Sequence, residues 1–265
     1  MYETLSVERE GHLTWLTLNR PAALNALSRA MVTELRAFFD GLGEDRETRV
    51  VVVRGAGRAF CAGLDLKESA GGDGSAGTPT EVLRAQRRIS ELVLMMRAAP
   101  QPIVAAVRGP ASGGGFAIAL AADVRIASAS ARMNAAFIRL GLSACDVGVS
   151  YFLPRLVGAS VASELLLTGD FIDAPRALAT GLVSSVVPDE DLDAAARAMA
   201  EAMLRNSPLG LRLTKECLRH SIDAGSLEQA VAMEDRNQAL AAGTRDFREG
   251  IAAFLEKRAP RYEDA

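Results

Sequence analysis

The sequence contains few of the side chains that most metal and nucleophile chemistries need. Its 265 residues include one tryptophan, three tyrosines, two histidines (His12 and His220) and three cysteines (Cys61, Cys145 and Cys217) that lie far apart in the chain. Because a closed zinc site takes four cysteine or histidine ligands at short spacings, we expect no metal site. Only three of the 30 basic residues are lysines, and none follows a glycine, which excludes a Walker-type phosphate loop.

An excess of charge of one sign is also lacking. The 30 basic residues are balanced by 33 acidic ones, for a net charge of −3, so we expect no nucleic-acid partner. The most apolar segments, 103–107 and 116–122, fall far below the roughly 18 residues of a membrane helix. The first residues lack the basic and apolar stretches of a signal peptide, and an odd number of scattered cysteines favours reduced thiols. We therefore expect a soluble cytoplasmic protein that does not enter a membrane.

What the chain does have is an alternation of strand and helix patterns. Residues 4–18 predict two strands joined by a turn, and the apolar run Val50–Val53 predicts a buried strand. Ser28 predicts a helix N-cap, because apolar residues follow it at helical spacing until Gly43. The other predicted elements are strands at 103–107 and 124–127 and helices at about 80–97 and 113–122. Together they predict an α/β body over residues 1–190.

The alternation of strand and helix patterns ends after residue 190. Residues 191–265 have mainly helical periodicity, broken at 206–208, 223–225 and 242–243, which predicts a helical C-terminal region. Such a region either covers its own core or packs on a neighbouring subunit. Within the body, residues 70–79 form the only low-complexity stretch and predict a mobile surface loop.

Two glycine-rich segments, 55–63 and 109–115, each follow a short apolar strand. Their small residues allow backbone N–H groups to approach a ligand beside a helix N-terminus. Two such loops aimed at one point can supply two N–H donors to a developing oxyanion. The alternative is that the glycines only permit tight turns and close packing of helix on strand.

Longer motifs resemble a known family. The segment Arg58-Ala59-Phe60-Cys61-Ala62-Gly63-Leu64-Asp65-Leu66-Lys67 resembles the first oxyanion loop of the enoyl-CoA hydratase/isomerase (crotonase) superfamily. Gly109, Gly113-Gly114-Gly115 and Ala121-Ala122-Asp123 resemble its second oxyanion segment, and further matches extend over nearly the whole chain. The resemblance implies an α/β crotonase-like spiral of ββα units with a C-terminal helical region. It also implies a homotrimer or a hexamer of paired trimers, an acyl-CoA thioester substrate, and no cofactor beyond the coenzyme A that the substrate carries.

The resemblance also assigns site residues by position. The oxyanion hole is formed by the backbone N–H groups of Leu64 and Gly114. Residues that match contacts to the CoA adenine and pantetheine are Ala22, Ala23, Leu24, Ala62, Asp65 and Leu66. Lys257 matches a basic position near the CoA phosphates that can reach across subunits.

The sequence departs from the family's hydratases at two positions. The glutamates that orient and activate water in those enzymes are replaced here by Ala117 and Phe137. Neither side chain can transfer a proton, so the paired-carboxylate hydration mechanism is excluded at these positions. We expect the Phe137 ring to make that side of the pocket apolar and to favour a bulky or aromatic acyl group.

One acid remains near these positions. Asp146 is similar in placement to an aspartate that transfers a proton in dienoyl-CoA isomerases, and to the nucleophilic aspartate of 4-chlorobenzoyl-CoA dehalogenase, which shares the pattern Asp-x-x-x-Ser-Tyr. The structural alternative is a helix N-cap. Three functions stay open: an isomerase-like enzyme with Asp146 as acid and base, a hydrolase or dehalogenase with Asp146 as nucleophile, and a non-catalytic acyl-CoA-binding protein. The first is favoured over the second because the dehalogenase's histidine has no counterpart here.

Overall fold

The main sheet has six strands in the order β1-β2-β3-β4-β6-β9 in the computed structural model, which describes residues 2–70 and 78–264. Its strands are β1 (Leu5–Glu10), β2 (Leu13–Leu18), β3 (Val50–Gly55), β4 (Ile103–Val107), β6 (Val124–Ser128) and β9 (Ser185–Val187). The first two form the predicted antiparallel hairpin, and all later neighbours are parallel. A second sheet, which the sequence analysis missed, consists of β5 (Pro110–Ser112), β7 (Arg132–Asn134) and β8 (Ile172–Asp173).

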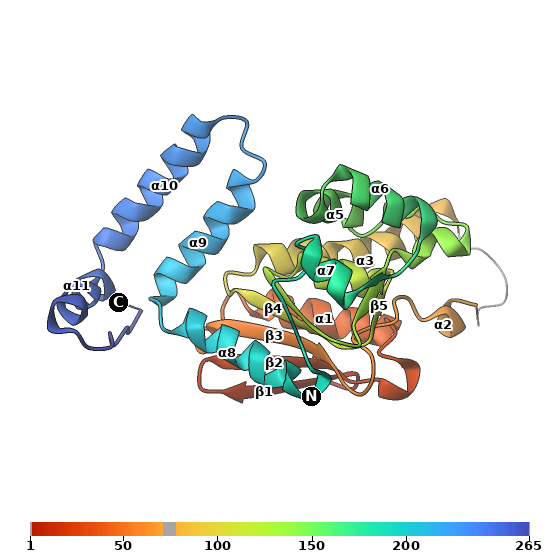
Figure 1. The fold of residues 1–265 in the computed structure, drawn as a ribbon, viewed down its shortest axis with the longest axis horizontal. Coiled ribbons are helices and arrows are strands. Elements are labelled where there is room, and N and C mark those ends of the chain that lie inside the picture. The colour runs from red at the N-terminus through yellow and green to blue at the C-terminus, as the bar shows by residue number, and fades with distance from the viewer. Residues whose placement is uncertain (1, 71–77, 265) are drawn as a thin grey trace.

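Helices cover both faces of the main sheet (Figure 1). The helices up to residue 204 are α1 (Arg29–Gly41), α2 (Leu66–Ala70), α3 (Pro79–Ala98), α4 (Gly114–Ala121), α5 (Val149–Val157), α6 (Ala159–Thr168), α7 (Ala174–Ala179) and α8 (Leu192–Leu204). Single turns of 3-10 helix are η1 (Pro21–Ala23), η2 (Ala136–Leu140) and η3 (Asp189–Asp191). The predicted cap at Ser28 is confirmed, because its Oγ accepts a hydrogen bond of 3.2 Å from the N–H of Met31. The predicted loop over 70–79 lies largely outside the described residues.

The apolar side chains of β3 pack into two hydrophobic clusters, one on each face of the main sheet. Val51 and Val53 point into the main core, which includes residues of α1, α3 and α4, whereas Val50 and Val52 face the other way and pack with Trp15. Successive side chains of a strand point to opposite faces, so a strand covered on both sides must be apolar throughout. The second face is closed by α8, which the sequence-based division counts with the C-terminal region.

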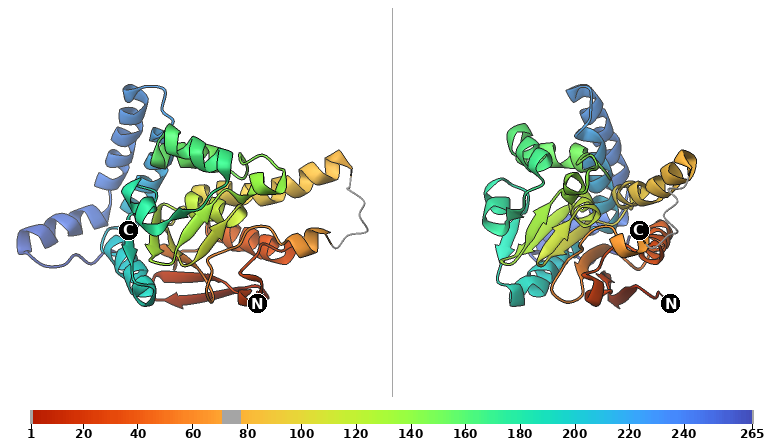
Figure 2. Two further views of the ribbon diagram at one scale, coloured as in Figure 1. Left: turned by 45° about the vertical axis from the view of Figure 1, so that its right-hand side comes forward. Right: turned by 90° about the vertical axis from the view of Figure 1, so that its right-hand side faces the viewer.

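The last three helices, α9 (Pro208–Ser221), α10 (Leu227–Ala242) and α11 (Arg245–Glu256), extend away from the sheet (Figures 1 and 2). One link between α9 and the body is Lys215, which is almost fully buried. Its Nζ donates to the carbonyl oxygens of Met96 (3.1 Å) and Gln101 (2.8 Å) and pairs with Asp123 at 2.9 Å. Burial lowers the pKa of Lys215 and the Asp123 carboxylate opposes that shift. A buried cation that keeps three oxygen partners holds α9 in one place on the body.

Candidate active site

The early loop after β2 and the first glycine-rich loop are joined by Asn25. Its fully buried side chain donates through Nδ2 to the carbonyl oxygens of Ala56 (2.9 Å) and Ala59 (2.8 Å). Its Oδ1 accepts from the N–H of Arg20 at 2.9 Å, and its backbone has a left-handed φ of 56°, which asparagine tolerates better than most residues. One side chain therefore fixes the relative position of both loops.

Backbone pairing turns the N–H of Leu64 away from the early loop. Leu27 donates to the carbonyl of Gly63 at 2.7 Å and accepts from the N–H of Asp65 at 3.1 Å, so Leu64 forms a parallel bridge with Leu27. In such a bridge, the N–H and C=O of the residue between the two bonded groups point to the opposite side. The Leu64 N–H is thus presented on the side away from Leu27.

The second loop meets the first at Gly63. A Cβ at this glycine would lie 2.7 Å from the carbonyl oxygen of Ser112 and 3.5 Å from the amide nitrogen of Gly114. Gly63 also has a φ of +92°, which side chains rarely adopt. The absence of a side chain lets the backbone on either side of Leu64 approach the start of α4.

Gly114 is the first residue of α4, so its N–H has no acceptor inside the helix. Among the hydrogen bonds of the described residues, neither the Leu64 nor the Gly114 N–H donates to a protein acceptor. The positive end of the helix dipole adds to the field at this point. The structure therefore brings together the two predicted oxyanion segments. The tight-packing alternative holds as well for Gly115, where a Cβ would lie 2.2 Å from the carbonyl oxygen of Cys61.

The other end of α4 is stabilised by a residue that the sequence analysis missed. Arg125 is buried, and its Nη1 donates to the carbonyl oxygens of Ala122 (2.6 Å) and Leu120 (3.2 Å) at the helix C-terminus. Its Nε donates to the carbonyl of Leu182 at 2.9 Å. Burial lowers the pKa of this guanidinium to about 10, which leaves it charged at neutral pH. No local sequence signal indicates such a cap, because the contacts depend on how β6 packs.

The predicted CoA-contact residues lie on neighbouring segments. Ala22 and Ala23 belong to η1, and the carbonyl of Leu24 accepts from the N–H of Ala62 at 3.0 Å. Asp65 forms an ion pair of 2.9 Å with Arg20, whose guanidinium lowers the pKa of that carboxyl. The exposed Leu66 begins α2 next to them. The contacts of Leu24 with Ala62 and of Arg20 with Asp65 therefore join the early loop to the segment that contains Leu64.

Apolar side chains occupy the two positions that the resemblance matches to glutamates. Ala117 is fully buried in α4, and Phe137, on η2, is 9% exposed. The Phe137 ring lies 3.4 Å from the point where a Cβ of Gly113 would be. The ring is thus packed against the residue that precedes the Gly114 N–H, and neither position provides a carboxylate.

Asp146 lies in the loop between η2 and α5 and is half-buried. Its Oδ1 accepts from Gln86 Nε2 on α3 at 2.6 Å and from the N–H of Val147 at 2.8 Å. The N-cap alternative is wrong, because α5 is preceded by Gly148 and has no side-chain cap. Burial raises the pKa of Asp146, and the two hydrogen bonds offset only part of that rise. Within the described part of the chain, no hydrogen bond or ion pair joins Asp146 to Leu64, Gly114 or Phe137.

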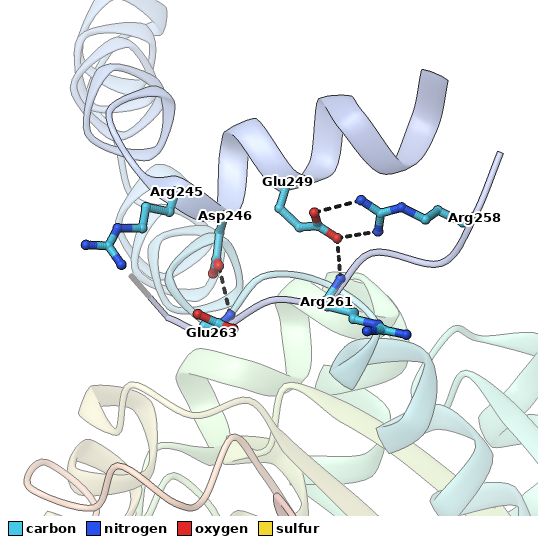
Figure 3. Close-up of a pocket in the computed structure, with 6 residues that line it drawn as sticks. All are labelled: Arg245, Asp246, Glu249, Arg258, Arg261 and Glu263. Atoms are coloured by element: carbon cyan, nitrogen blue, oxygen red, sulfur yellow. Dashed lines mark hydrogen bonds and ion pairs between the residues drawn. The ribbon is translucent and has the colours of Figure 1, made fainter. Parts of the chain in front are cut away.

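Lys257 is not brought to the other predicted site residues within one chain. It caps α11 with a left-handed φ of 54°, and α11 lies at the opposite end of the molecule from α2 (Figure 1). The segment that follows Lys257 folds back along α11 (Figure 3). There, Oε1 of Glu249 accepts hydrogen bonds from Arg258 Nη1 at 2.6 Å and from the N–H of Arg261 at 2.7 Å. A cavity of about 540 Å³ lies between this segment and α11, far from the glycine-rich loops.

Over 2–70 and 78–264, no three side chains of His, Cys, Asp or Glu are grouped so that they could hold a metal ion. Over the same ranges, no helix has both the length and the apolar character to cross a membrane.

Comparisons with known proteins agree with this geometry. Residues 8–265 match the protein family described as enoyl-CoA hydratase/isomerase. A "probable enoyl-CoA hydratase" of Mycobacterium tuberculosis is 43% identical over 259 residues, which are 94% of this chain and 88% of that protein. The 1,2-epoxyphenylacetyl-CoA isomerase of Escherichia coli K12 is 35% identical over 258 residues, 97% of each chain. The crystal structure of an enoyl-CoA hydratase from Bacillus anthracis superposes on this chain with a TM-score of 0.93 at 37% identity. The superposition covers 99% of this chain and 100% of that chain. This overlap confirms the predicted fold class.

Proposed function

Because this chain belongs to the enoyl-CoA hydratase/isomerase family and is an enzyme of that family, we propose that it binds an acyl-CoA thioester and shifts a double bond by proton transfer through Asp146. The proposal rests on two unengaged backbone N–H groups, those of Leu64 and Gly114, and on the half-buried carboxylate of Asp146, whose pKa is raised by burial.

The backbone groups would act on the thioester carbonyl. When a proton leaves the carbon next to this carbonyl, negative charge develops on its oxygen and an enolate forms. The Leu64 and Gly114 N–H groups would each donate a hydrogen bond to that oxygen, and the dipole of α4 would stabilise the same charge. Because both donors are fixed by the surrounding backbone, they need little reorganisation as the charge grows.

The carboxylate would move the proton. Asp146 takes a proton from one carbon of the acyl chain, the electron pair shifts through the enolate, and the same carboxyl returns the proton two carbons away. No atom is gained or lost, so a single acid-base group suffices. A base works best when its pKa lies near the working pH, and burial shifts the pKa of Asp146 in that direction. The 1,2-epoxyphenylacetyl-CoA isomerase of E. coli, at 35% identity, supports isomerisation as the reaction class.

The two-glutamate hydration mechanism needs carboxylates that Ala117 and Phe137 do not provide. With Ala117 and Phe137 at the two glutamate positions, a water molecule has no pair of acids to orient and deprotonate it. The Phe137 ring beside Gly113 also supports a bulky or aromatic acyl group as the preferred substrate.

We expect hydration of crotonyl-CoA to be slower than about 0.1 per second, roughly a hundredfold below the median enzyme turnover. The measurement follows the loss of enoyl-thioester absorbance, with isomerisation of 3-hexenoyl-CoA and of a phenyl-substituted 3-enoyl-CoA run in parallel. Hydration at tens per second would contradict the proposal. Release of free CoA or of halide from a chlorobenzoyl-CoA would favour Asp146 as a nucleophile, and tight binding without turnover would favour the acyl-CoA-binding protein.

We also propose that the chain forms a homotrimer, or a hexamer of two trimers, through its C-terminal helices. On α11, Phe254 is 83% exposed and Leu255 is 74% exposed, and Phe247 and Ile251 on the same helix are also exposed. Apolar patches of this kind on a protein surface mark association sites. In such an assembly, Lys257 would reach the CoA phosphates bound to a neighbouring subunit.

The assembly is tested by light scattering coupled to size-exclusion chromatography. A chain of 28.0 kDa is expected to elute as a species of about 84 kDa or twice that mass. Phe254→Asp with Leu255→Asp is expected to reduce the assembly to monomers, because it places two charges in the apolar contact. Ser160→Asp, at an exposed position of α6, serves as the control. A wild-type protein that elutes at the monomer mass would contradict this proposal.

A further inference from the structure

The Asp146 carboxylate is held by one of its two oxygens. Both hydrogen-bond donors that contact it, Gln86 Nε2 and the N–H of Val147, bond to Oδ1, at 2.6 and 2.8 Å. Gln86 lies on α3, 60 residues earlier in the chain, and is half-buried. In the described residues, no such donor contacts Oδ2.

We propose that Gln86 is a positioning residue that ties down Oδ1 of Asp146, so that Oδ2 is the oxygen that exchanges the substrate proton. This inference rests on the proposed function of Asp146 as the acid-base group. A carboxylate with one oxygen fixed by two donors cannot rotate about its Cβ–Cγ bond without breaking both hydrogen bonds. Its second oxygen therefore keeps one direction, which proton transfer to a fixed carbon requires.

The backbone donor is fixed by an unusual turn. Val147 has a φ of +46°, a left-handed value that is rare for a β-branched residue, and its side chain is buried in the main core. The carbonyl of Asp146 accepts from the N–H of Val149 at 2.9 Å, which closes the turn. Backbone strain of this kind persists only where the surroundings enforce it, and it is concentrated at functional sites. The turn directs the Val147 N–H back to the neighbouring carboxylate.

The partner on α3 is neutral, and this matters for the basicity of Asp146. A cation at that distance would lower a carboxyl pKa strongly, whereas an amide donor stabilises the carboxylate less. Charged groups of the flanking elements have partners of their own: on α3, Arg88 bonds Thr33 and Glu91 pairs with Arg36, and on α5, Arg155 pairs with Asp223. Two further cations of α3, Arg84 and Arg87, are exposed. The causes of the pKa shift of Asp146 are burial, Val147 and Gln86, with no charged group among them. Gln86 thus orients the carboxylate while leaving it a usable base.

The test compares Gln86→Met, which keeps the side-chain length without a donor, with Gln86→Lys, which keeps a donor and adds a charge. Gln86→Met is expected to lower kcat about 10- to 100-fold on an accepted 3-enoyl-CoA, with KM changed less than about threefold. Losing a hydrogen bond to the ionised form raises the pKa of Asp146, so the acidic limb of the kcat profile moves to higher pH. Gln86→Lys moves it to lower pH, because the ammonium favours the carboxylate.

The control is Arg87→Met, an exposed position one residue further along α3, which is expected to leave kcat and the pH profile unchanged. The pKa of Asp146, read from its ¹³C carboxyl resonance in wild type and both Gln86 variants, gives the same comparison without turnover. Opposite pKa shifts in the two variants support the inference, and an Asp146 resonance that titrates alike in all three overturns it. If Asp146→Asn keeps full activity, the proposed function fails. If that variant is inactive while Gln86→Met keeps the wild-type kcat and pH profile, the positioning role alone fails.

Discussion

Asp146→Asn is expected to lower kcat for double-bond isomerisation about 10²- to 10⁴-fold, the range that a general acid-base group contributes. The amide has the size of the carboxyl, and its Oδ1 can still accept from Gln86 and from the N–H of Val147. The fold is therefore expected to remain intact, and the loss reports on proton transfer. The measurement is kcat together with exchange of substrate protons into deuterated solvent, which reports deprotonation even when no product accumulates.

Asp170→Asn is the matched control, since Asp170 is an exposed aspartate that pairs with Arg139 at the surface. It is expected to keep both kcat and the exchange rate. Unchanged turnover and exchange in Asp146→Asn would remove this aspartate from the mechanism. If the wild type exchanges no proton on any acyl-CoA that it binds, the non-catalytic alternative becomes the better account.

Gly114→Pro is expected to lower kcat about 10²- to 10³-fold, because it removes one of the two oxyanion donors. Proline is well tolerated at the first position of a helix, where the N–H has no partner inside the helix. The comparison is Gly114→Ala, which retains the N–H and adds a Cβ at the same place, 2.8 Å from the flexible end of Leu27. The difference between the two variants isolates the hydrogen bond from the added bulk.

Binding of a saturated acyl-CoA, measured by calorimetry, completes this experiment. The hydrogen bond strengthens as charge develops on the carbonyl oxygen, so affinity is expected to fall much less than kcat in Gly114→Pro. Equal kcat values for the proline and alanine variants would show that the Gly114 N–H does not stabilise the enolate.

Most strands and helices up to β6 were predictable because their signals are local, whereas β9 and the helices α5, α6 and α7 were not predicted. The apolar run of β3, the cap at Ser28 and the apolar spacing of α1 each lie within a few residues. The second sheet was missed, because strands of two or three residues such as β7 and β8 are too short to show an alternation.

The site residues also differ in whether a local sequence signal marks them. The glycine-rich loops and the apolar residues Ala117 and Phe137 can be recognised directly in the sequence. The contact of Gln86 with Asp146 spans 60 residues, and that of Arg125 with Leu182 spans 57. Such pairs depend on how helices pack on the sheet, and no motif marks either residue. Asp146 also shows how a local rule misleads, since an aspartate near a helix start favours a cap, but the turn at Val147 moves it out of the capping position.

The burial of Lys215 limits which lysine side chains can react with an amine reagent. With this amine enclosed, the exposed lysine side chains are Lys67 on α2 and Lys257 behind α11, which lie at opposite ends of the molecule. A short amine-reactive cross-linker therefore cannot join them within one chain. Any Lys67–Lys257 product must connect two subunits, so its presence would report how the C-terminal helix of one subunit sits beside the first glycine-rich loop of the next.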